Sequence, residues 1–537
     1  MLKNIDEIMA DINVDDYEDY GKYIAKLDLK LLNDKNKNGK LILITAITPT
    51  PSGEGKTTTA IGLGNAMKKL KKNVGIAIRE PSLGPCFGVK GGATGGGKST
   101  VEPSDKINLI FTGDFPAIST AHNLLSAMIN NHIFHGNKLN IDPKRVVFPR
   151  NVDMDDRSLR SIIVGNGDRN TGILMNDHYV ITAASEIMAI MALSLNYKDL
   201  KNRLKNILIG YTYDGKPVFA GDLNATGAMA ALLVDALKPN IVQTSENVPA
   251  IIHTGPFGNI AHGTSSIIGD YIGLKLFDYL ITEAGFGSDL GFEKFMNIFT
   301  RESKLNVNAV VIVATLRALK YHGGSKNIDN ADMDALKKGM DNLYRHVEIV
   351  RSFGIEPVIA INRHNKDTED ELKFVSDELN KRNIIYSTSD VYSMGGDGGI
   401  DLAKKVIENI NENNIKYTYD LKDDIRTKII KIAKNVYKAK DVKFSDDAEK
   451  TLKIINKYNF NNFYVCMAKT QSSLSDNPKL LNSPENFNVT VNMININSGS
   501  KFIVPVLGNI MTMPGLPKKP AAENIDIDDD GNIIGLS

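Results

Sequence analysis

Short apolar runs alternate along most of the chain with segments whose apolar residues recur at helical spacing. The runs predict strands at residues 41–46, 74–78, 107–111, 207–210, 279–282, 309–314 and 357–361. Because the runs are largely continuous rather than alternating, these strands are expected to be buried on both faces. The helical segment at 332–352 carries an apolar stripe that consists of Leu336, Met340, Leu343, Val347 and Val350. This alternation predicts an α/β fold with a doubly wound, mostly parallel sheet.

The stretch at 42–59, ILITAITPTPSGEGKTTT, combines a strand, a glycine loop and a Lys-Thr pair before a helix predicted at 60–70. This is the P-loop arrangement, in which backbone N–H groups and a helix N-terminus surround phosphate oxygens. Lys56 would reach the β- and γ-phosphates, and the Thr57 hydroxyl would bind Mg²⁺. Thr50 stands where the motif has its first glycine, so an ordinary glycine-rich turn is the alternative. We predict a P-loop NTPase-like fold with the candidate nucleotide ligands Thr50, Pro51, Ser52, Gly53, Glu54, Gly55, Lys56 and Thr57.

The pattern changes beyond Pro357. Residues 401–480 are rich in Lys, Asn and Asp and mainly helical in pattern, whereas strands and turns are expected from Val489 onward. We predict a P-loop nucleotide-binding domain at 1–360, with room for inserted segments, and two smaller α+β domains toward the C-terminus. These are an α/β domain at 361–480 and a β-rich segment or domain at 481–537.

Loops that follow the predicted strands carry the other candidate residues. Arg79 ends the strand at 74–78, where a guanidinium can hold an anion bidentately, although a surface pair with Glu80 is the alternative. Asp114 follows the strand at 107–111, where P-loop enzymes hold an acidic residue for Mg²⁺ or water, and it could equally cap a helix that starts near Ala117. We take Lys56, Arg79 and Asp114 as candidate catalytic residues.

Two further loops are rich in glycine. His253 and His262 lie in the first, and loops of this kind often carry binding residues, although a lone histidine can equally be structural. We take His253 as a fourth candidate catalytic residue. In the second loop Phe286 stands between two glycines, so its ring could stack on a flat ligand or could belong to the core.

Composition excludes several classes of function. Apolar residues make up 42% of the chain and charged residues 24%, as in soluble globular proteins. The net charge is +1, from 64 basic and 63 acidic residues, so no nucleic-acid partner is expected. No stretch approaches 18 apolar residues, so no membrane partner is expected either. Only Cys86 and Cys466 occur, and the N-terminus lacks a secretory signal, which together predict a cytoplasmic protein.

Seven stretches carry a more specific signal. They are TPTPSGEGKTTT (48–59), REPSLGPCFGVKGGATGGGK (79–98), FTGDF (111–115), GPFGNIAHG (255–263), TEAGFGSDLG (282–291), VCMAKTQSSLSD (465–476) and FIVPVLGNIMTMPGLPK (502–518). Together they resemble formate–tetrahydrofolate ligase, also called formyltetrahydrofolate synthetase, from about residue 40 to residue 520. The motifs are long and rarely shared, so the resemblance is specific.

The resemblance implies a ligase that converts formate, MgATP and tetrahydrofolate to 10-formyltetrahydrofolate, ADP and phosphate through formyl phosphate. It implies that Arg79 holds formyl phosphate and that the substrate pterin stacks on aromatic side chains at Phe286, His364 and Tyr392, the last two in the domain at 361–480. It also implies a homotetramer and activation by a monovalent cation such as K⁺ or NH₄⁺.

Departures from the family lie in the folate pocket. His364 and Tyr392 stand where the family has phenylalanine and tryptophan, and this chain has no tryptophan. Ile110 and Pro116 replace histidines that flank the Thr-Gly-Asp segment in the family. We therefore expect intact ATP and formyl phosphate chemistry with altered folate affinity or polyglutamate preference. The alternatives are a P-loop carboxylate ligase with a different amine acceptor, and a nucleotide-binding relative without catalytic activity.

Overall fold

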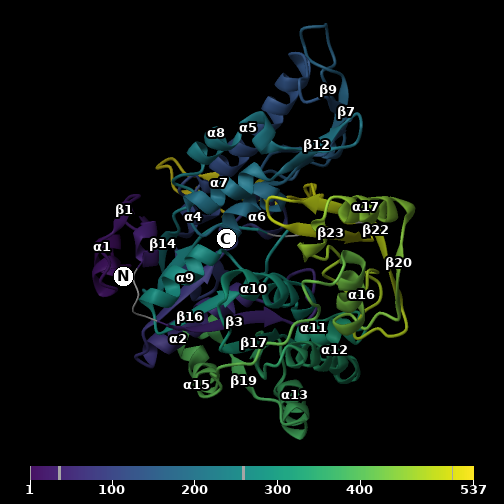
Figure 1. Ribbon diagram of the computed structural model, residues 1–537. Helices are drawn as coiled ribbons and strands as arrows, with labels where there is room; N and C mark the ends of the chain where they lie inside the picture. Colours follow the sequence, from purple (N-terminus) through teal and green to yellow (C-terminus); the bar gives the residue numbers. More distant parts are fainter. Residues whose placement is uncertain (1, 34–37, 257–259, 509, 511, 537) are drawn as a thin grey trace.

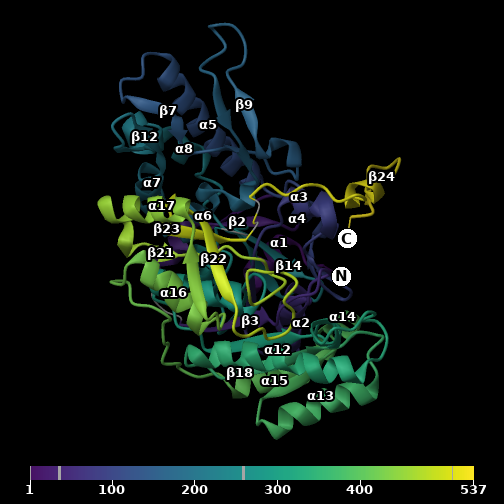
Figure 2. The same ribbon diagram turned by 90° about the vertical axis from the view of Figure 1, so that its right-hand side faces the viewer.

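The computed structural model describes residues 2–33, 38–256, 260–508, 510 and 512–536. Residues 257–259 of the predicted loop around His253 and His262, and residues 509 and 511 of the stretch at 502–518, lie outside the described residues. A large mixed sheet occupies the centre of the molecule, with smaller sheets above and beside it (Figure 1, Figure 2). The chain therefore has the α/β class that the alternation predicts.

Neighbouring parallel strands form most of the central sheet. Their order is β15 (Pro249–Ile252), β4 (Val74–Ile78), β16 (Tyr279–Glu283), β3 (Lys40–Ala46), β17 (Ala309–Ala314), β18 (Pro357–Asn362) and β19 (Tyr386–Ser389). The strands predicted at 41–46, 74–78, 279–282, 309–314 and 357–361 are thus confirmed. Because the strands are parallel, their carboxyl ends and the loops that follow them meet at one edge of the sheet.

An antiparallel group extends one side of this sheet. It contains β14 (Asn240–Thr244), which pairs with β15, and also β2 (Ala25–Leu27), β1 (Tyr17–Asp19), β6 (Ser99–Glu102) and β5 (Gly95–Gly96). The hydrophobic pattern predicted a mostly parallel sheet, and the strands around β3 are indeed parallel. The pattern did not predict the antiparallel group. These strands are short and contain polar residues, so they lack a continuous apolar run.

Helices cover both faces of the central sheet, as strands without polar alternation require. Ile42 and Ile44 of β3 pack on one face with α2 (Lys56–Lys69) and α15 (Ile400–Glu408). Leu41 and Leu43 pack on the opposite face with α9 (Ile267–Leu276) and α12 (Met333–Ser352). Further helices are α1 (Ile5–Asp11), α10 (Thr300–Ser303), α11 (Leu316–His322), α13 (Glu369–Lys381) and α14 (Val391–Met394).

A part of the chain after β6 projects above the central sheet (Figure 1). It contains α5 (Asp114–Phe134), α6 (Glu186–Leu193), α7 (Tyr197–Lys205), α8 (Thr226–Leu232), the sheet of β7 (Ile141–Val146), β12 (Leu208–Thr212) and β13 (Pro217–Phe219), and the hairpin of β9 (Ile162–Val164) and β10 (Met175–Asp177). The strand predicted at 207–210 exists as β12, but its partners are antiparallel and outside the central sheet.

The strand predicted at 107–111 is wrong. The chain forms a helix there, α4 (Ser104–Asn108), and then a turn in which Phe111 has φ 48°. Asn108 interrupts the apolar run, and its side chain is buried. Its polar atoms are satisfied, since Oδ1 accepts from the N–H of Ala93 at 2.8 Å and Nδ2 donates to Thr94 Oγ1 at 3.1 Å. These bonds to the loop of Ala93 and Thr94 hold Asn108 at the end of a helix rather than in a sheet strand.

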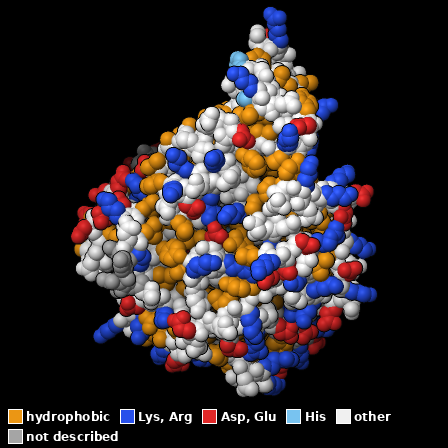
Figure 3. All heavy atoms as spheres, in the orientation of Figure 1, with side chains coloured by type: hydrophobic (Ala, Val, Ile, Leu, Met, Phe, Trp, Pro, Cys, Tyr) orange, Lys and Arg blue, Asp and Glu red, His pale blue; other side chains and the backbone are white. Residues whose placement is uncertain are grey.

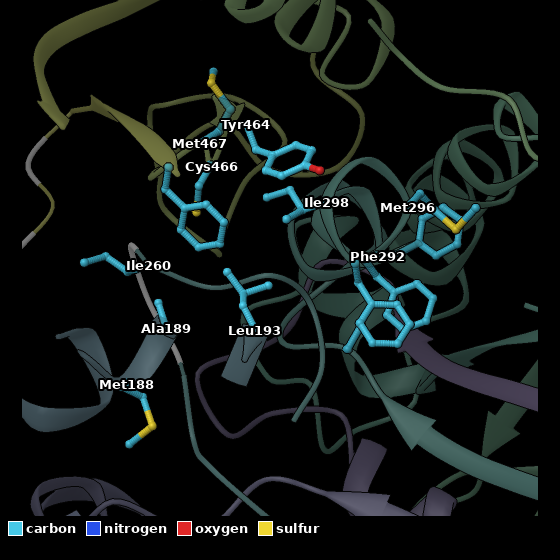
Figure 4. Close-up of a cluster of buried hydrophobic side chains, with 14 of the residues drawn as sticks. Met188, Ala189, Leu193, Ile260, Phe292, Met296, Ile298, Tyr464, Cys466 and Met467 are labelled. Carbon is cyan, nitrogen blue, oxygen red and sulfur yellow. The ribbon is translucent and has the colours of Figure 1, made fainter. Parts of the chain in front are cut away.

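The C-terminal strands form a separate sheet beside the central one (Figure 2). Its order is β20 (Asp441–Phe444), β22 (Asn488–Asn497), β23 (Phe502–Leu507) and β21 (Tyr464–Val465), with α16 (Ile425–Asn435) and α17 (Asp446–Lys457) packed nearby. Figure 4 shows Leu193 of α6, Ile298 and Cys466 among buried side chains that face one another between these parts. The C-terminal sheet is therefore joined to the remainder by apolar packing.

No helix among the described residues is both long enough and apolar enough to cross a membrane. On the face drawn in Figure 3, basic and acidic side chains are interspersed.

Gly75 provides a test of packing in the central sheet. A Cβ built on its backbone would lie 2.2 Å from the ring of buried Phe277. We expect Gly75→Ala to lower the free energy of unfolding by about 1–3 kcal/mol, because overpacking forces the backbone to shift. Gly227→Ala in α8 is the matched control, since nothing lies within 4 Å of its Cβ; we expect it to be neutral or to stabilise by about 0.5–1 kcal/mol. Urea unfolding followed by circular dichroism measures both, and equal effects would contradict this packing.

Candidate active site

The predicted phosphate ligands at 50–57 lie in the phosphate loop, residues 47–55, which connects the end of β3 to α2, and in the first residues of that helix. Gly53 and Gly55 have φ values of 80° and 73°, in the left-handed region that favours glycine. Gly55 is the N-cap of α2, and no side chain caps this helix end. The first N–H groups of the helix and the positive end of its dipole are therefore available to an anion.

The buried side chain of Glu54 stabilises the conformation of the phosphate loop. Its buried carboxylate accepts from the N–H of Thr50 at 2.7 Å and from the hydroxyl of Thr315 at the end of β17. Asn362, at the end of β18, donates to the carbonyl of Glu54 at 3.1 Å, and a Cβ on Gly55 would lie 2.7 Å from the same amide nitrogen. Side chains that follow or end two neighbouring strands, β17 and β18, therefore fix the loop. Glu54 sets the conformation of the loop through contacts within the protein.

Arg79, Glu283 and Thr57 come together because β4, β16 and β3 are neighbours. Thr57 Oγ1 donates to Glu283 Oε2 at 2.9 Å. Arg79 Nη2 lies 3.7 Å from Glu283 Oε1, and Arg79 Nη1 donates to the carbonyl of Pro256 at 3.4 Å. The ion pair of Arg79 is thus with Glu283, not with Glu80, so the alternative in which Arg79 pairs with Glu80 is wrong.

Positive charge exceeds negative charge around Glu283. Burial lowers the pKa of Lys56 to about 8, with nearby Glu283 opposing this shift and Arg79 adding to it. Lys90 lies at the surface, and its pKa is also lowered, by partial desolvation and next by nearby Arg79. Among the described residues, neither lysine has a hydrogen-bond or ion-pair partner. Three cations therefore interact with one carboxylate, and a polyanion would relieve their mutual repulsion.

The donors present fit Mg²⁺. The Thr57 hydroxyl and the Glu283 carboxylate provide hard oxygen atoms at the mouth of the loop. No group of three or more His, Cys, Asp or Glu side chains suited to a metal occurs within the described ranges. Mg²⁺ needs none, because it commonly takes one or two protein oxygens and completes its shell with substrate phosphates and water.

Asp114 is the first residue of α5, with Gly113 as N-cap, so the prediction that it caps a helix from Ala117 is wrong. Its carboxylate accepts from Lys26 Nζ at 2.7 Å and from Asn240 Nδ2 at 2.8 Å. The ion pair with Lys26 is buried on both sides. The catalytic role of Asp114 stays a prediction, and its observed contacts are structural.

His253 is also bonded within the protein. Its Nδ1 lies 2.8 Å from Ser266 Oγ, and its Nε2 lies 2.9 Å from the carbonyl oxygen of Ala236. Burial lowers the pKa of His253 to about 3, so the ring is neutral. The catalytic role of His253 stays a prediction too. His262 is equally buried, but neither of its ring nitrogens has a hydrogen-bond partner among the described residues.

Phe286, His364 and Tyr392 follow β16, β18 and β19, so all three lie after strands that end at the same edge of the sheet. Phe286 is half-buried, with φ 59°. His364 is half-buried, and its N–H donates to Asp367 at 2.8 Å. Tyr392 is 57% exposed and packs on the loop of Gly96. No ring contact joins these three side chains within the described residues.

Sequence reasoning did not single out Glu283, Lys90 or Asn362. Glu283 and Asn362 end apolar strands, as Arg79 does, so the same positional signal could have found them. Lys90 is the last residue of the segment Cys86–Lys90, which comes after β4, and it carried no such signal.

The pKa of Lys56 generates a test of anion binding. The ammonium is half-deprotonated near pH 8, and a bound phosphate raises its pKa, so ATP binding should take up protons. We expect uptake of about half a proton per ATP at pH 8. The uptake should be smaller below pH 8 and larger toward pH 9, because the fraction of neutral Lys56 in the free protein rises with pH. Calorimetry in buffers of different ionisation enthalpy measures it. Lys56→Met should abolish the uptake and Lys68→Met, in the last turn of the same helix, should keep it; uptake that survives Lys56→Met would contradict the assignment.

Comparisons with known proteins cover the whole chain. Residues 1–537 match the family described as "Formate--tetrahydrofolate ligase". The chain is 66% identical to the formate–tetrahydrofolate ligase of Picrophilus torridus and 62% identical to that of Thermoplasma volcanium, in each case over 537 residues and 100% of both chains. It is 51% identical to the ligase of Caldicellulosiruptor saccharolyticus over 541 residues, which cover 99% of this chain and 98% of that one. The protein belongs to the formate–tetrahydrofolate ligase family.

Proposed function

We propose that the protein ligates formate to tetrahydrofolate at the expense of ATP, giving 10-formyltetrahydrofolate, ADP and phosphate. The observation that carries this proposal is the gathering of Lys56, Arg79, Glu283 and the Thr57 hydroxyl at the mouth of a glycine loop. The loop between β3 and α2 supports a P-loop NTPase-like nucleotide site, with its uncapped helix end as the phosphate contact.

In the first step, a formate oxygen attacks the γ-phosphorus in line and the β–γ bridging oxygen leaves with ADP, which yields formyl phosphate. Lys56 and Arg79 oppose the negative charge that spreads over the transferring group. This step is needed because formate itself would have to lose an oxide-like group, whereas phosphate leaves readily. Thr57 and Glu283 would hold Mg²⁺, which supplies further neutralisation of the phosphate oxygens.

In the second step, the amine nitrogen of tetrahydrofolate attacks the formyl carbon, the carbon–oxygen bond to phosphate breaks, and the nitrogen loses its proton. Arg79 keeps the phosphate end of the intermediate in place through its guanidinium. Phe286, His364 and Tyr392 provide the aromatic side chains for the pterin, which must lie near the mouth of the phosphate loop for the two reactants to meet.

Other features of the proposal stay predictions. They are the division at residues 1–360, 361–480 and 481–537, the cytoplasmic location, the homotetramer, and activation by K⁺ or NH₄⁺. The central sheet continues through β18 and β19, so residues on both sides of 360 contribute to one sheet and, in this proposal, to one active site.

Formate-dependent release of ADP tests the first step. We expect the wild-type protein to release ADP only when formate and tetrahydrofolate are both present. Absorbance should then show the 10-formyl product. Lys56→Ala and Arg79→Ala should each lower kcat/KM by about 100-fold or more, since each removes charge stabilisation of the transferring group. Lys72→Ala, at an exposed lysine beyond the far end of α2, is the matched control. Turnover with other amines in place of the folate would favour a different carboxylate ligase, and absence of any turnover would favour a nucleotide-binding relative.

His364 tests the acceptor pocket. A phenylalanine ring presents a larger apolar face to a pterin, and aromatic pairs contribute about 0.5–1.5 kcal/mol beyond burial. We therefore expect His364→Phe to lower KM for tetrahydrofolate about three- to tenfold while KM for ATP stays unchanged. His135→Phe, at the far end of α5, is the control. An unchanged KM for tetrahydrofolate in His364→Phe would contradict a place for this residue in the pocket.

A further inference from the structure

We propose that His346 is a positioning residue that holds the phosphate loop and the loop of Phe286 at a fixed spacing. This inference rests on the proposed function, because it assigns the first loop to the nucleotide and the second to the acceptor.

The imidazole of His346 bridges the two loops directly. On one side, Nε2 lies 2.9 Å from Oγ1 of Thr48, two residues before Thr50 of the phosphate loop. On the other side, Nδ1 lies 2.7 Å from Oγ of Ser288, two residues after Phe286. All three side chains of this bridge are fully buried. A neutral imidazole has one donor and one acceptor nitrogen, so a single ring can satisfy both hydroxyls.

The loop of Phe286 lies against the imidazole with no room between them. A Cβ on Gly287 would lie 3.2 Å from Cε1 of His346 and 3.2 Å from the carbonyl oxygen of Ile47. A Cβ on Gly285 would lie 3.0 Å from Nη1 of Arg79. The two glycines that flank Phe286 therefore place its backbone between the anion-binding arginine and the bridging histidine.

Thr48 is held from several sides, which makes it a firm anchor for the bridge. Asn342 lies one helical turn before His346 on α12. Its Oδ1 accepts from the N–H of Thr48 at 3.3 Å, and its Nδ2 donates to Thr48 Oγ1 at 3.0 Å. His322 Nε2 lies 2.9 Å from the carbonyl oxygen of Thr48. Every polar group of Thr48 thus contacts a side chain of α11 or α12, so the position of these helices is transmitted to the start of the phosphate loop.

Substitution of His346 tests the inference. We expect His346→Leu to raise KM for ATP and KM for tetrahydrofolate each by about tenfold, since a lost pair of buried hydrogen bonds has effects of this order. His346→Gln keeps one donor and one acceptor and should restore both constants to within about threefold of wild type. His122→Leu is the matched control, since His122 is equally buried and its Nε2 lies 3.0 Å from the carbonyl oxygen of Pro149. It should lower thermal stability and leave both KM values unchanged.

Ser288→Ala provides a second variant that leaves the contact between His346 and Thr48 intact. It should raise KM for tetrahydrofolate but not KM for ATP. Calorimetric ATP affinity, measured without formate or folate, should fall in His346→Leu and stay unchanged in Ser288→Ala, and this readout holds even if the proposed ligase activity fails. The inference is overturned if His346→Leu lowers only the melting temperature, as His122→Leu does, with wild-type KM values and ATP affinity.

Discussion

The parallel arrangement of β4, β16, β3, β17 and β18 is the constraint on which the site depends. Parallel neighbours end at the same edge, about 4.8 Å apart, so the loops that follow them come within reach of each other's side chains. Thr57 after β3 contacts Glu283 at the end of β16, and Asn362 at the end of β18 contacts the phosphate loop. Residues distant in sequence thus share one site through contacts that the strand order creates.

Positive charge exceeds negative charge in this site, and the proposed reaction explains the excess. Lys56, Arg79 and Lys90 all interact with Glu283, and partial desolvation together with nearby Arg79 lowers the pKa of both lysines. In the protein alone this arrangement is costly, since desolvated like charges repel one another. A bound triphosphate reverses the balance, and cations already held in place need no reorganisation when charge spreads over the transferring group. The site is therefore better matched to a phosphorylated substrate than to water.

Sequence reasoning predicted β4, β16, β3, β17 and β18 because each is a continuous apolar run with helices on either side, but it missed the short parallel strand β15 (Pro249–Ile252). It missed β19, whose residues Tyr386–Ser389 include three hydroxyl side chains after the tyrosine, and it misassigned 107–111, where buried Asn108 bonds to a neighbouring loop. Lys56 and Arg79 were predicted as site residues from their places after strands. The position of Glu283 at a strand end was visible in the sequence, but its contact with Thr57 was not, because that contact requires β16 to lie between β4 and β3. Strand order of this kind leaves no trace in local periodicity.

The same strand order constrains where the acceptor can bind in the proposed site. Phe286 follows β16, whereas His364 and Tyr392 follow β18 and β19, and β3 with its phosphate loop lies between these two groups. The strands of Phe286 and His364 are three spacings apart, or about 14 Å. A flat acceptor that contacts rings on both sides must therefore lie across the mouth of the phosphate loop. In the proposed reaction, an acceptor in that position would cover the transferred phosphoryl group, so that its binding would both bring the amine to the formyl carbon and limit the access of water to the proposed anhydride.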